Sequence, residues 1–312
     1  MNRFTTARRP AASLIAAVVG GLVLAACGSG SGSDEAAPSG GGSDGAGSAV
    51  DSVAALVPAE FKNKAIVNAI YNDYPPHEFV KDGKLVGIQP DISAAIAKVM
   101  GVEIKVESVG SFDSLIPGTV SGRYDMSSAD FGVTAERLEQ IDFVTQFKIG
   151  TGFAVKKGSD VTIEKTTDLC GLTIGVQSGS YFIDQLKTVE AECSSAGLEK
   201  IDLKTFPNDG ARTLALTNGR IQVTATGQDA LGYQISSQNV PLELQPFVYE
   251  PLEQAIVLPD GSELGPAVEA AMKEIVSNGT YAEILKKWGV DELAYSTADE
   301  VLYLTDPSQT PK

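Results

Sequence analysis

The segment from Ser121 to Val144 reads SGRYDMSSADFGVTAERLEQIDFV and combines a strand pattern with a helix-start signal. Gly122 ends a helical segment, and the residues YDMSSA have the apolar pattern of a short strand. Thr134 then stands where a helix N-cap is expected, ahead of Ala-Glu-Arg. A strand that leads into a helix start presents free backbone N–H groups, and Arg137 lies a turn away. Together these groups can bind a carboxylate without catalytic machinery, so the segment predicts a binding site.

The same segment resembles the type 3 extracellular solute-binding proteins of amino-acid ABC transporters. Their signature has a G-(R/K)-x-D strand, a short Ser/Thr-rich loop, T-x-x-R and a D-F pair, and residues 122–125, 134–137 and 142–143 match it in order. The resemblance extends from about Ala65 to Gly289. It implies an α/β fold of the two-lobed periplasmic-binding-protein type II, in which each lobe is a mainly parallel sheet flanked by helices and two hinge strands join the lobes.

Strand and helix patterns alternate along the chain, and this alternation also indicates a mainly parallel α/β sheet. A helix is expected over residues 209–217. The extended segments 147–155 and 252–259 are expected as the two hinge strands. We expect residues 61–149 and 255–292 to form lobe 1, residues 150–254 to form lobe 2, and residues 293–312 to form a C-terminal tail.

The N-terminus has the features of an export signal. Three arginines precede an apolar run that is too short and too rich in small residues for a membrane span, so residues 1–26 are expected to be a signal peptide. Leu-Ala-Ala-Cys27 resembles a bacterial lipobox, which implies a lipid on Cys27 and a membrane anchor. Residues 27–60 are then the lipidated cysteine and a Gly/Ser tether. The chain is expected to be an extracytoplasmic lipoprotein, exported by the general secretory or the twin-arginine route.

Composition excludes some partners. The net charge is −16 and no basic run exists, which argues against nucleic acid. With Cys27 assigned to the lipid, Cys170 and Cys193 remain, and an even pair in an exported protein favours a disulfide over two unrelated buried thiols. We expect a monomer.

The resemblance also implies ligand-binding residues in both lobes. Arg137 is expected to bind the ligand carboxylate, and Tyr74 and Phe112 stand where the family has aromatic residues that stack on the ligand. The single histidine, His77, cannot form a metal site with others of its kind, and we interpret it as incidental. The expected ligand-binding residues are Tyr74, Phe112, Asp130, Phe131, Gly132, Thr134 and Arg137 in lobe 1, and Gly179, Ser180, Tyr181, Gly227 and Asp229 in lobe 2.

One departure from the family concerns the ligand's ammonium group. Gly227 occupies the position of the aspartate that usually accepts it. Asp130 and Asp229 are the two candidates to replace that charge. Asp130 is slightly favoured, because it precedes Arg137 on the same loop and is expected to border the same pocket. The ligand is then a zwitterion in a rearranged pose, or a carboxylate without the usual α-ammonium group.

The resemblance implies a receptor that binds a small carboxylated solute, first of all an amino acid, between its lobes and delivers it to an ABC permease and its ATPase. No cofactor, metal or catalytic residue is expected. An enzyme on the same fold, similar to cyclohexadienyl dehydratases, is one alternative, although a single histidine and no Gly-x-Ser-x-Gly elbow give it little support. A sensor that presents ligand to a signalling receptor is another.

Overall fold

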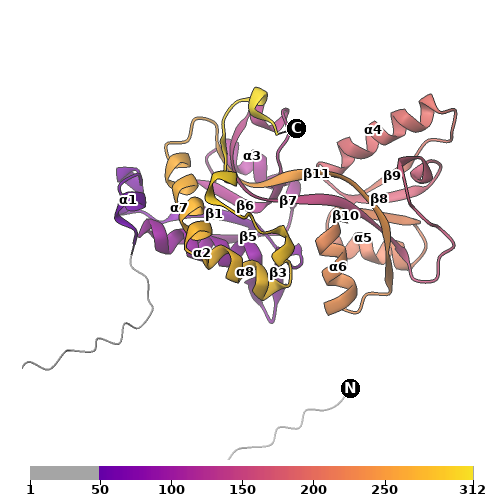
Figure 1. Ribbon diagram of the computed structural model, residues 1–312, viewed down its shortest axis with the longest axis horizontal. Helices are drawn as coiled ribbons and strands as arrows, with labels where there is room; N and C mark the ends of the chain where they lie inside the picture. Colours follow the sequence, from indigo (N-terminus) through magenta and orange to yellow (C-terminus); the bar gives the residue numbers. More distant parts are fainter. Residues whose placement is uncertain (1–48, 312) are drawn as a thin grey trace, which may run out of the picture. The chain divides into compact units, whose positions relative to one another are not determined.

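Two long antiparallel strands, β7 (Ile141–Lys156) and β11 (Leu242–Pro259), lie side by side in the middle of the sheet. The computed structural model describes residues 49–311. In it the two strands pair from Ile141 opposite Pro259 to Lys156 opposite Leu242, with three shifts of register. The expected hinge segments lie within them. Figure 1 shows both strands passing from one group of strands and helices to the other.

Lobe 1 is the part of the sheet in which β5, β1 and β6 lie beside β11. The strand β1 (Ile66–Tyr71) pairs in parallel with β5 (Ile104–Val109) and β6 (Met126–Gly132). Every residue of β6 is buried, as expected for a strand that is covered on both faces. A small antiparallel sheet, β2 (Asp73–Tyr74), β3 (Glu78–Lys81) and β4 (Lys84–Val86), follows β1.

Lobe 2 is the part in which β10, β8 and β9 lie beside β7. The strands β8 (Thr173–Gln177), β9 (Asp202–Phe206) and β10 (Val223–Gly227) pair in parallel, and β10 joins β7 in an antiparallel pair. The sheet order β5-β1-β6-β11-β7-β10-β8-β9 therefore places the carboxyl ends of β1, β6, β8 and β10 where the two lobes meet.

Helices bury apolar residues on both faces of each lobe. In lobe 1 one core cluster unites residues of α1, α2, α7 and α8 with the sheet, and a second cluster includes Leu115 of α3. In lobe 2 α4 contributes to one cluster, and α5 and α6 contribute to another. The bounds are α1 Asp51–Ala54, α2 Ile88–Met100, α3 Leu115–Val120, α4 Phe182–Ser195, α5 Asp209–Thr217, α6 Gln228–Ser237, α7 Gly265–Ser277 and α8 Thr280–Trp288.

The fold includes residues at both ends that were expected outside it. Residues 51–60 were expected in the tether, but α1 packs Val53 into the core of lobe 1, because this stretch carries apolar side chains at helical spacing. The expected C-terminal tail adds β12 (Tyr303–Leu304) to β7 and buries Val301. Cys27 and the signal peptide lie outside the described residues.

The helix expected from Thr134 is wrong. The local cap exists, since Thr134 Oγ1 accepts the N–H of Arg137 at 3.2 Å. Only a 3-10 turn, Arg137–Glu139, follows, because the long strand β7 begins at Ile141 and leaves no room for a helix. The N–H groups of this junction therefore belong to a turn.

The predicted disulfide is present. Cys170 follows a 3-10 turn (Thr166–Leu169), Cys193 lies in α4, and their Cα atoms are 5.6 Å apart. The bridge ties α4 to the segment that precedes β8. Within residues 49–311, no helix combines the length and apolar character needed to cross a bilayer.

Candidate functional site

The loop after β1 is fixed by the start of α2. The N–H groups of Ile88 and Gln89 have no partners within the helix, and they donate to the carbonyls of Pro76 and His77 at 3.1 and 2.9 Å. This approach requires Gly87, whose φ is +137°, because a Cβ there would lie 2.2 Å from the carbonyl oxygen of His77. The loop thereby holds Tyr74 and His77 over the ends of the sheet.

Tyr74 connects the two lobes. Its hydroxyl accepts the N–H of Gly227 at 3.2 Å, at the end of β10. A Cβ at Gly227 would lie 2.5 Å from this hydroxyl and 2.7 Å from Oδ1 of Asp229. The space beside Gly227 is therefore filled, on one side by the tyrosine and on the other by the carboxylate of Asp229.

His77 lies between two carboxylates that come from opposite lobes. Its Nε2–H donates to Oδ2 of Asp229 at 2.5 Å, and its Nδ1 lies 3.8 Å from Oδ2 of Asp130. The imidazole has no exposed surface, and each of the two carboxylate side chains is 3% exposed. The interpretation of His77 as incidental is wrong, since this residue joins both candidates for the ammonium site.

Burial and charge set the protonation of this cluster. Burial disfavours the imidazolium, but the charges of Asp130 and Asp229 and the hydrogen bond to Asp229 raise the pKa of His77 to about 9. Burial raises the pKa of Asp130 to about 7, with His77 opposing and Asp229 reinforcing the shift. Burial also raises the pKa of Glu78 well above its usual range, and the two aspartates add to the effect. At neutral pH the imidazole of His77 is therefore protonated.

A small inner cavity of about 20 Å³ lies beside Asp130, between the lobes. Aromatic rings form most of its wall, and Gln177 and Ser180 from the end of β8 contribute polar atoms. Asp130 has φ +57°, a backbone conformation that few residues other than glycine adopt. The residues that line the cavity are Tyr71, Tyr74, Phe112, Ala129, Asp130, Gln177, Ser180, Tyr181 and Phe182.

Arg137 forms a second connection between the lobes. Its Nη1 donates to the carbonyl of Gly132 at 2.7 Å, and its Nη2 donates to the carbonyl of Gly179 at 2.9 Å. Its guanidinium carbon lies 6.0 Å from the centre of the Phe131 ring. Burial lowers the pKa of Arg137 to about 10, while the acidic groups of Tyr181, Asp184 and Glu136 oppose this shift. The guanidinium therefore stays charged at neutral pH.

Arg137 and Asp130 do not line one cavity, in contrast to the expectation. Arg137, Thr134 and Gly179 line an outer pocket of about 300 Å³, and only Ser180 borders both spaces. The ring of Tyr181 packs on the backbone of Gly132, where a Cβ would lie 2.4 Å from it. Tyr181 thus fills space near the end of β6.

The remaining expected residues have structural contacts. Phe131 is fully buried and stacks on Phe112, with ring centres 5.0 Å apart. The hydroxyl of Ser180 donates to the carbonyl of Gln177 at 2.7 Å. Phe131 lies behind the aromatic wall and does not line the inner cavity.

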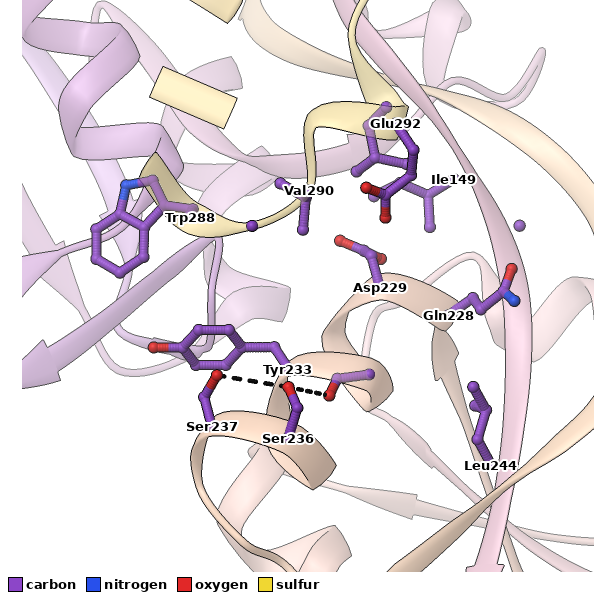
Figure 2. Close-up of a pocket in the computed structure, with 14 residues that line it drawn as sticks. Ile149, Gln228, Asp229, Tyr233, Ser236, Ser237, Leu244, Trp288, Val290 and Glu292 are labelled. Atoms are coloured by element: carbon purple, nitrogen blue, oxygen red, sulfur yellow. Dashed lines mark hydrogen bonds between the residues drawn. The ribbon is translucent and has the colours of Figure 1, made fainter. Parts of the chain in front are cut away.

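A larger pocket, of about 430 Å³, lies on another side of Asp229 (Figure 2). Figure 2 shows Asp229 at the start of α6, near Val290 and Glu292, with the rings of Tyr233 and Trp288 farther along the pocket. The indole N–H of Trp288 donates to Asp91 at 2.7 Å, and its ring packs on the core of lobe 1. These contacts make Trp288 a packing residue of lobe 1.

Sequence reasoning missed His77, Glu78 and Gln177. Both carboxylate oxygens of Glu78 and the amide nitrogen of Gln177 are buried, with no hydrogen-bond partner in the part of the chain that the structure describes. The signal for His77 was its position directly after the Tyr-Pro-Pro turn, next to a residue already expected at the ligand. Among residues 49–311, no group of three His, Cys, Asp or Glu side chains is arranged to hold a metal ion.

Comparison with known proteins agrees with this architecture. The family model described as bacterial extracellular solute-binding proteins, family 3, matches residues 66–291. The arginine-binding protein ArgT of Corynebacterium glutamicum is 26% identical over 261 residues, which cover 83% of this chain and 84% of ArgT. The L-cystine-binding protein TcyJ of Escherichia coli is 28% identical over 218 residues, which cover 69% of this chain and 79% of TcyJ.

Solved structures give the same result. A structure of an ancestral arginine-binding protein bound to arginine has a TM-score of 0.64 and 32% identity, over 72% of this chain and 98% of that one. These relatives are named as binding proteins, and the chain is likewise a binding protein and not an enzyme. The chain belongs to family 3 of the bacterial extracellular solute-binding proteins.

Proposed function

We propose that this chain is an extracytoplasmic receptor that binds an amino acid between its lobes, with cationic amino acids as the first candidates. The observation that carries the proposal is the convergence of Asp130 and Asp229, from opposite lobes, on one buried position at His77. Two buried carboxylates that meet across a closing cleft provide a site for a positive charge. The arginine-binding relatives support this choice of ligand.

The ligand's carboxylate has a partner in Arg137. A guanidinium has five N–H donors, and Arg137 uses one on Gly132 and one on Gly179. Opening of the lobes breaks the contact with Gly179, which leaves donors free for a carboxylate in a bidentate arrangement. Closing over the ligand then brings the N–H groups around Gly179 toward the same carboxylate.

The aromatic wall suits a cationic or planar side chain. Tyr74 and Phe112 both line the inner cavity, and Phe131 supports Phe112 from behind. A guanidinium or ammonium group placed against these rings gains cation–π attraction in addition to burial of its apolar stem. The cavity is small in the closed form, so the ligand enters when the lobes are apart.

Delivery and anchoring complete the proposed role. The closed form is what an ABC permease with its ATPase would recognise, and a lipid on Cys27, outside the described residues, would hold the receptor at the membrane. A Cys27→Ala variant should appear in the culture medium or remain unprocessed. A strain without the receptor should lose high-affinity uptake of the ligand. Retained uptake with intact binding would instead favour the sensor role.

A thermal-shift screen tests the ligand. The mature protein is unfolded in guanidinium to remove bound solute, refolded, and screened against the proteinogenic amino acids and cystine. A ligand at one hundred times its Kd adds about 2.7 kcal/mol to the free energy of unfolding, which gives a clear shift. The proposal expects L-arginine or another cationic amino acid among the hits. If no amino acid shifts the melting temperature, the proposed ligand class is wrong.

A further inference from the structure

His77 is the only histidine in the chain, and two carboxylates and two aromatic rings lie against its imidazole. Asp130 comes from β6 and Asp229 from α6. The ring of Tyr74, from β2, stacks on the imidazole with centres 5.1 Å apart and planes 15° apart. Phe147, from β7, lies 5.5 Å away. The two carboxylates are thus the charged groups in direct contact with the imidazole, while aromatic rings exclude water from it.

The cluster has more acceptors than it can satisfy by itself. Oδ1 of Asp130, Oδ1 of Asp229 and both carboxylate oxygens of Glu78 are buried and have no hydrogen-bond partner among residues 49–311, and the same holds for Nδ1 of His77. Buried carboxylate oxygens of this kind need a cation or a proton. The imidazolium of His77 supplies a positive charge to this cluster, since it lies against both aspartates.

This charge acts between the lobes. Asp130 belongs to lobe 1, together with His77, whereas Asp229 belongs to lobe 2. A Cβ atom at Gly227 would lie 2.7 Å from Oδ1 of Asp229. The carboxylate of Asp229 is therefore next to the place where the side chain of an aspartate at position 227 would begin. A cation between Asp130 and Asp229 therefore draws the lobes together.

We propose that protonated His77 is a built-in cation that closes the empty cleft by binding Asp130 and Asp229, and that a ligand cation takes over this role in exchange for the His77 proton. The exchange is balanced: one cation enters the cluster, and one proton leaves His77 for the solvent. The second part rests on the proposed function, since it requires a positively charged ligand. The first part concerns the protein without ligand and is independent of it.

The expected pH dependence has a definite sign. His77 has a pKa of about 9 in the closed form and an ordinary value of 6.5 when it is solvated in an open form. Closure is therefore favoured fully below pH 6.5 and loses this contribution as the pH rises through 9. Within that window the closing equilibrium constant falls about tenfold for each pH unit. Asp130, raised from 3.8 to about 7, acts in the same direction but at lower pH.

Small-angle X-ray scattering of the ligand-stripped protein tests the first part. The wild type should show a larger radius of gyration at pH 9.5 than at pH 7, because the lobes separate when His77 loses its proton. His77→Gln removes the charge and should give one radius at both pH values. His77→Phe keeps an aromatic ring against Tyr74 and should also give one radius at both pH values. This second variant controls for a folding defect in His77→Gln.

Glu78→Gln is the matched control, because it removes a neighbouring buried carboxyl and leaves His77 in place. It should retain the difference between pH 7 and pH 9.5. A wild type with no such difference would overturn the proposal. So would a difference that persists in both His77 variants and disappears in Glu78→Gln, since the proton would then belong to Glu78.

Titration calorimetry with L-arginine at pH 8 tests the exchange of the ligand cation for the His77 proton. Two buffers of different ionisation enthalpy give the number of protons released on binding. The wild type should release most of a proton per bound arginine, and His77→Gln should release almost none. Equal release by both proteins would overturn the exchange. If L-arginine does not bind the wild type at all, the proposed ligand fails, and the scattering experiment still decides whether His77 closes the cleft.

Discussion

Nε2 of His77 lies 2.5 Å from Oδ2 of Asp229, although the two residues are 152 positions apart and belong to different lobes. Nδ1 of the same ring faces Asp130 at 3.8 Å. Both carboxylates that could replace the missing aspartate at position 227 therefore belong to one cluster. We therefore expect Asp130 and Asp229 to bind a ligand cation together.

The pair leads to a prediction for two variants. Asp130→Asn and Asp229→Asn should each weaken the binding of an amine-bearing ligand by at least about tenfold, or 1.4 kcal/mol, since each removes a buried negative charge. Asparagine also tolerates the positive φ of Asp130. Titration calorimetry with the best amino acid from the screen measures the effect.

Asp82→Asn is the control for this pair. Asp82 also has a positive φ, +52°, but it is exposed in the turn between β3 and β4. Its variant should bind as the wild type does. Wild-type affinity in both cleft variants would assign the ammonium site to other residues.

Arg137 gives a second prediction. Arg137→Ala should cost about 2 kcal/mol of ligand affinity, roughly 30-fold, because it removes a charged donor to the carboxylate and the bond that holds Gly179. The fold should persist. Arg220→Ala removes an exposed arginine of lobe 2 and should leave affinity unchanged. Equal affinities of the two variants would mean that the carboxylate is bound elsewhere.

Much of the fold could be predicted because it depends on local patterns. The helix α5 spans Asp209–Thr217, as expected from its apolar spacing and the turn that follows it. The disulfide could be predicted from the count of cysteines in a chain that was expected to be exported. The prediction of a helix at Thr134 was wrong. The Thr134 cap is present, and a local sequence pattern can indicate it. The start of β7 at Ile141 depends on pairing with distant strands of the sheet, which no local pattern indicates.

The site could be predicted only in part. The aromatic residues and Arg137 stood in motifs, and the structure brings them to the region between the lobes. His77 was dismissed because a lone histidine was weighed only as a metal ligand. Its partners are 53 and 152 positions away, so no local pattern indicates that the imidazole serves two carboxylates as a cation.

The disulfide gives a third prediction, about stability. Replacing both Cys170 and Cys193 with alanine should lower the free energy of unfolding by about 3 kcal/mol, since the bridge closes a loop with a sequence separation of 23 residues. Urea unfolding monitored by circular dichroism measures the change. Ligand affinity should be unaffected. A loss well under 1 kcal/mol would show that the bridge constrains the unfolded chain little.

A fourth prediction concerns a buried ion pair in lobe 2. Arg212 is 1% exposed and donates to Asp209, which also accepts a bond of 2.6 Å from Gln234. Arg212→Ala leaves Asp209 buried without its charge partner and should cost about 3–5 kcal/mol of stability. Arg220→Ala should change stability by under about 0.5 kcal/mol. Similar unfolding midpoints for these variants would contradict the role assigned to Arg212.

Titration calorimetry of L-arginine binding to the ligand-stripped protein tests whether the cleft between the lobes is an amino-acid site. We expect saturable binding at one site, with a negative heat-capacity change as the lobes close over apolar surface. We also expect weaker binding in both Arg137→Ala and Asp130→Asn. If neither L-arginine nor any other amino acid gives a saturable heat, or if both variants bind it as tightly as the wild type, the cleft is not an amino-acid site.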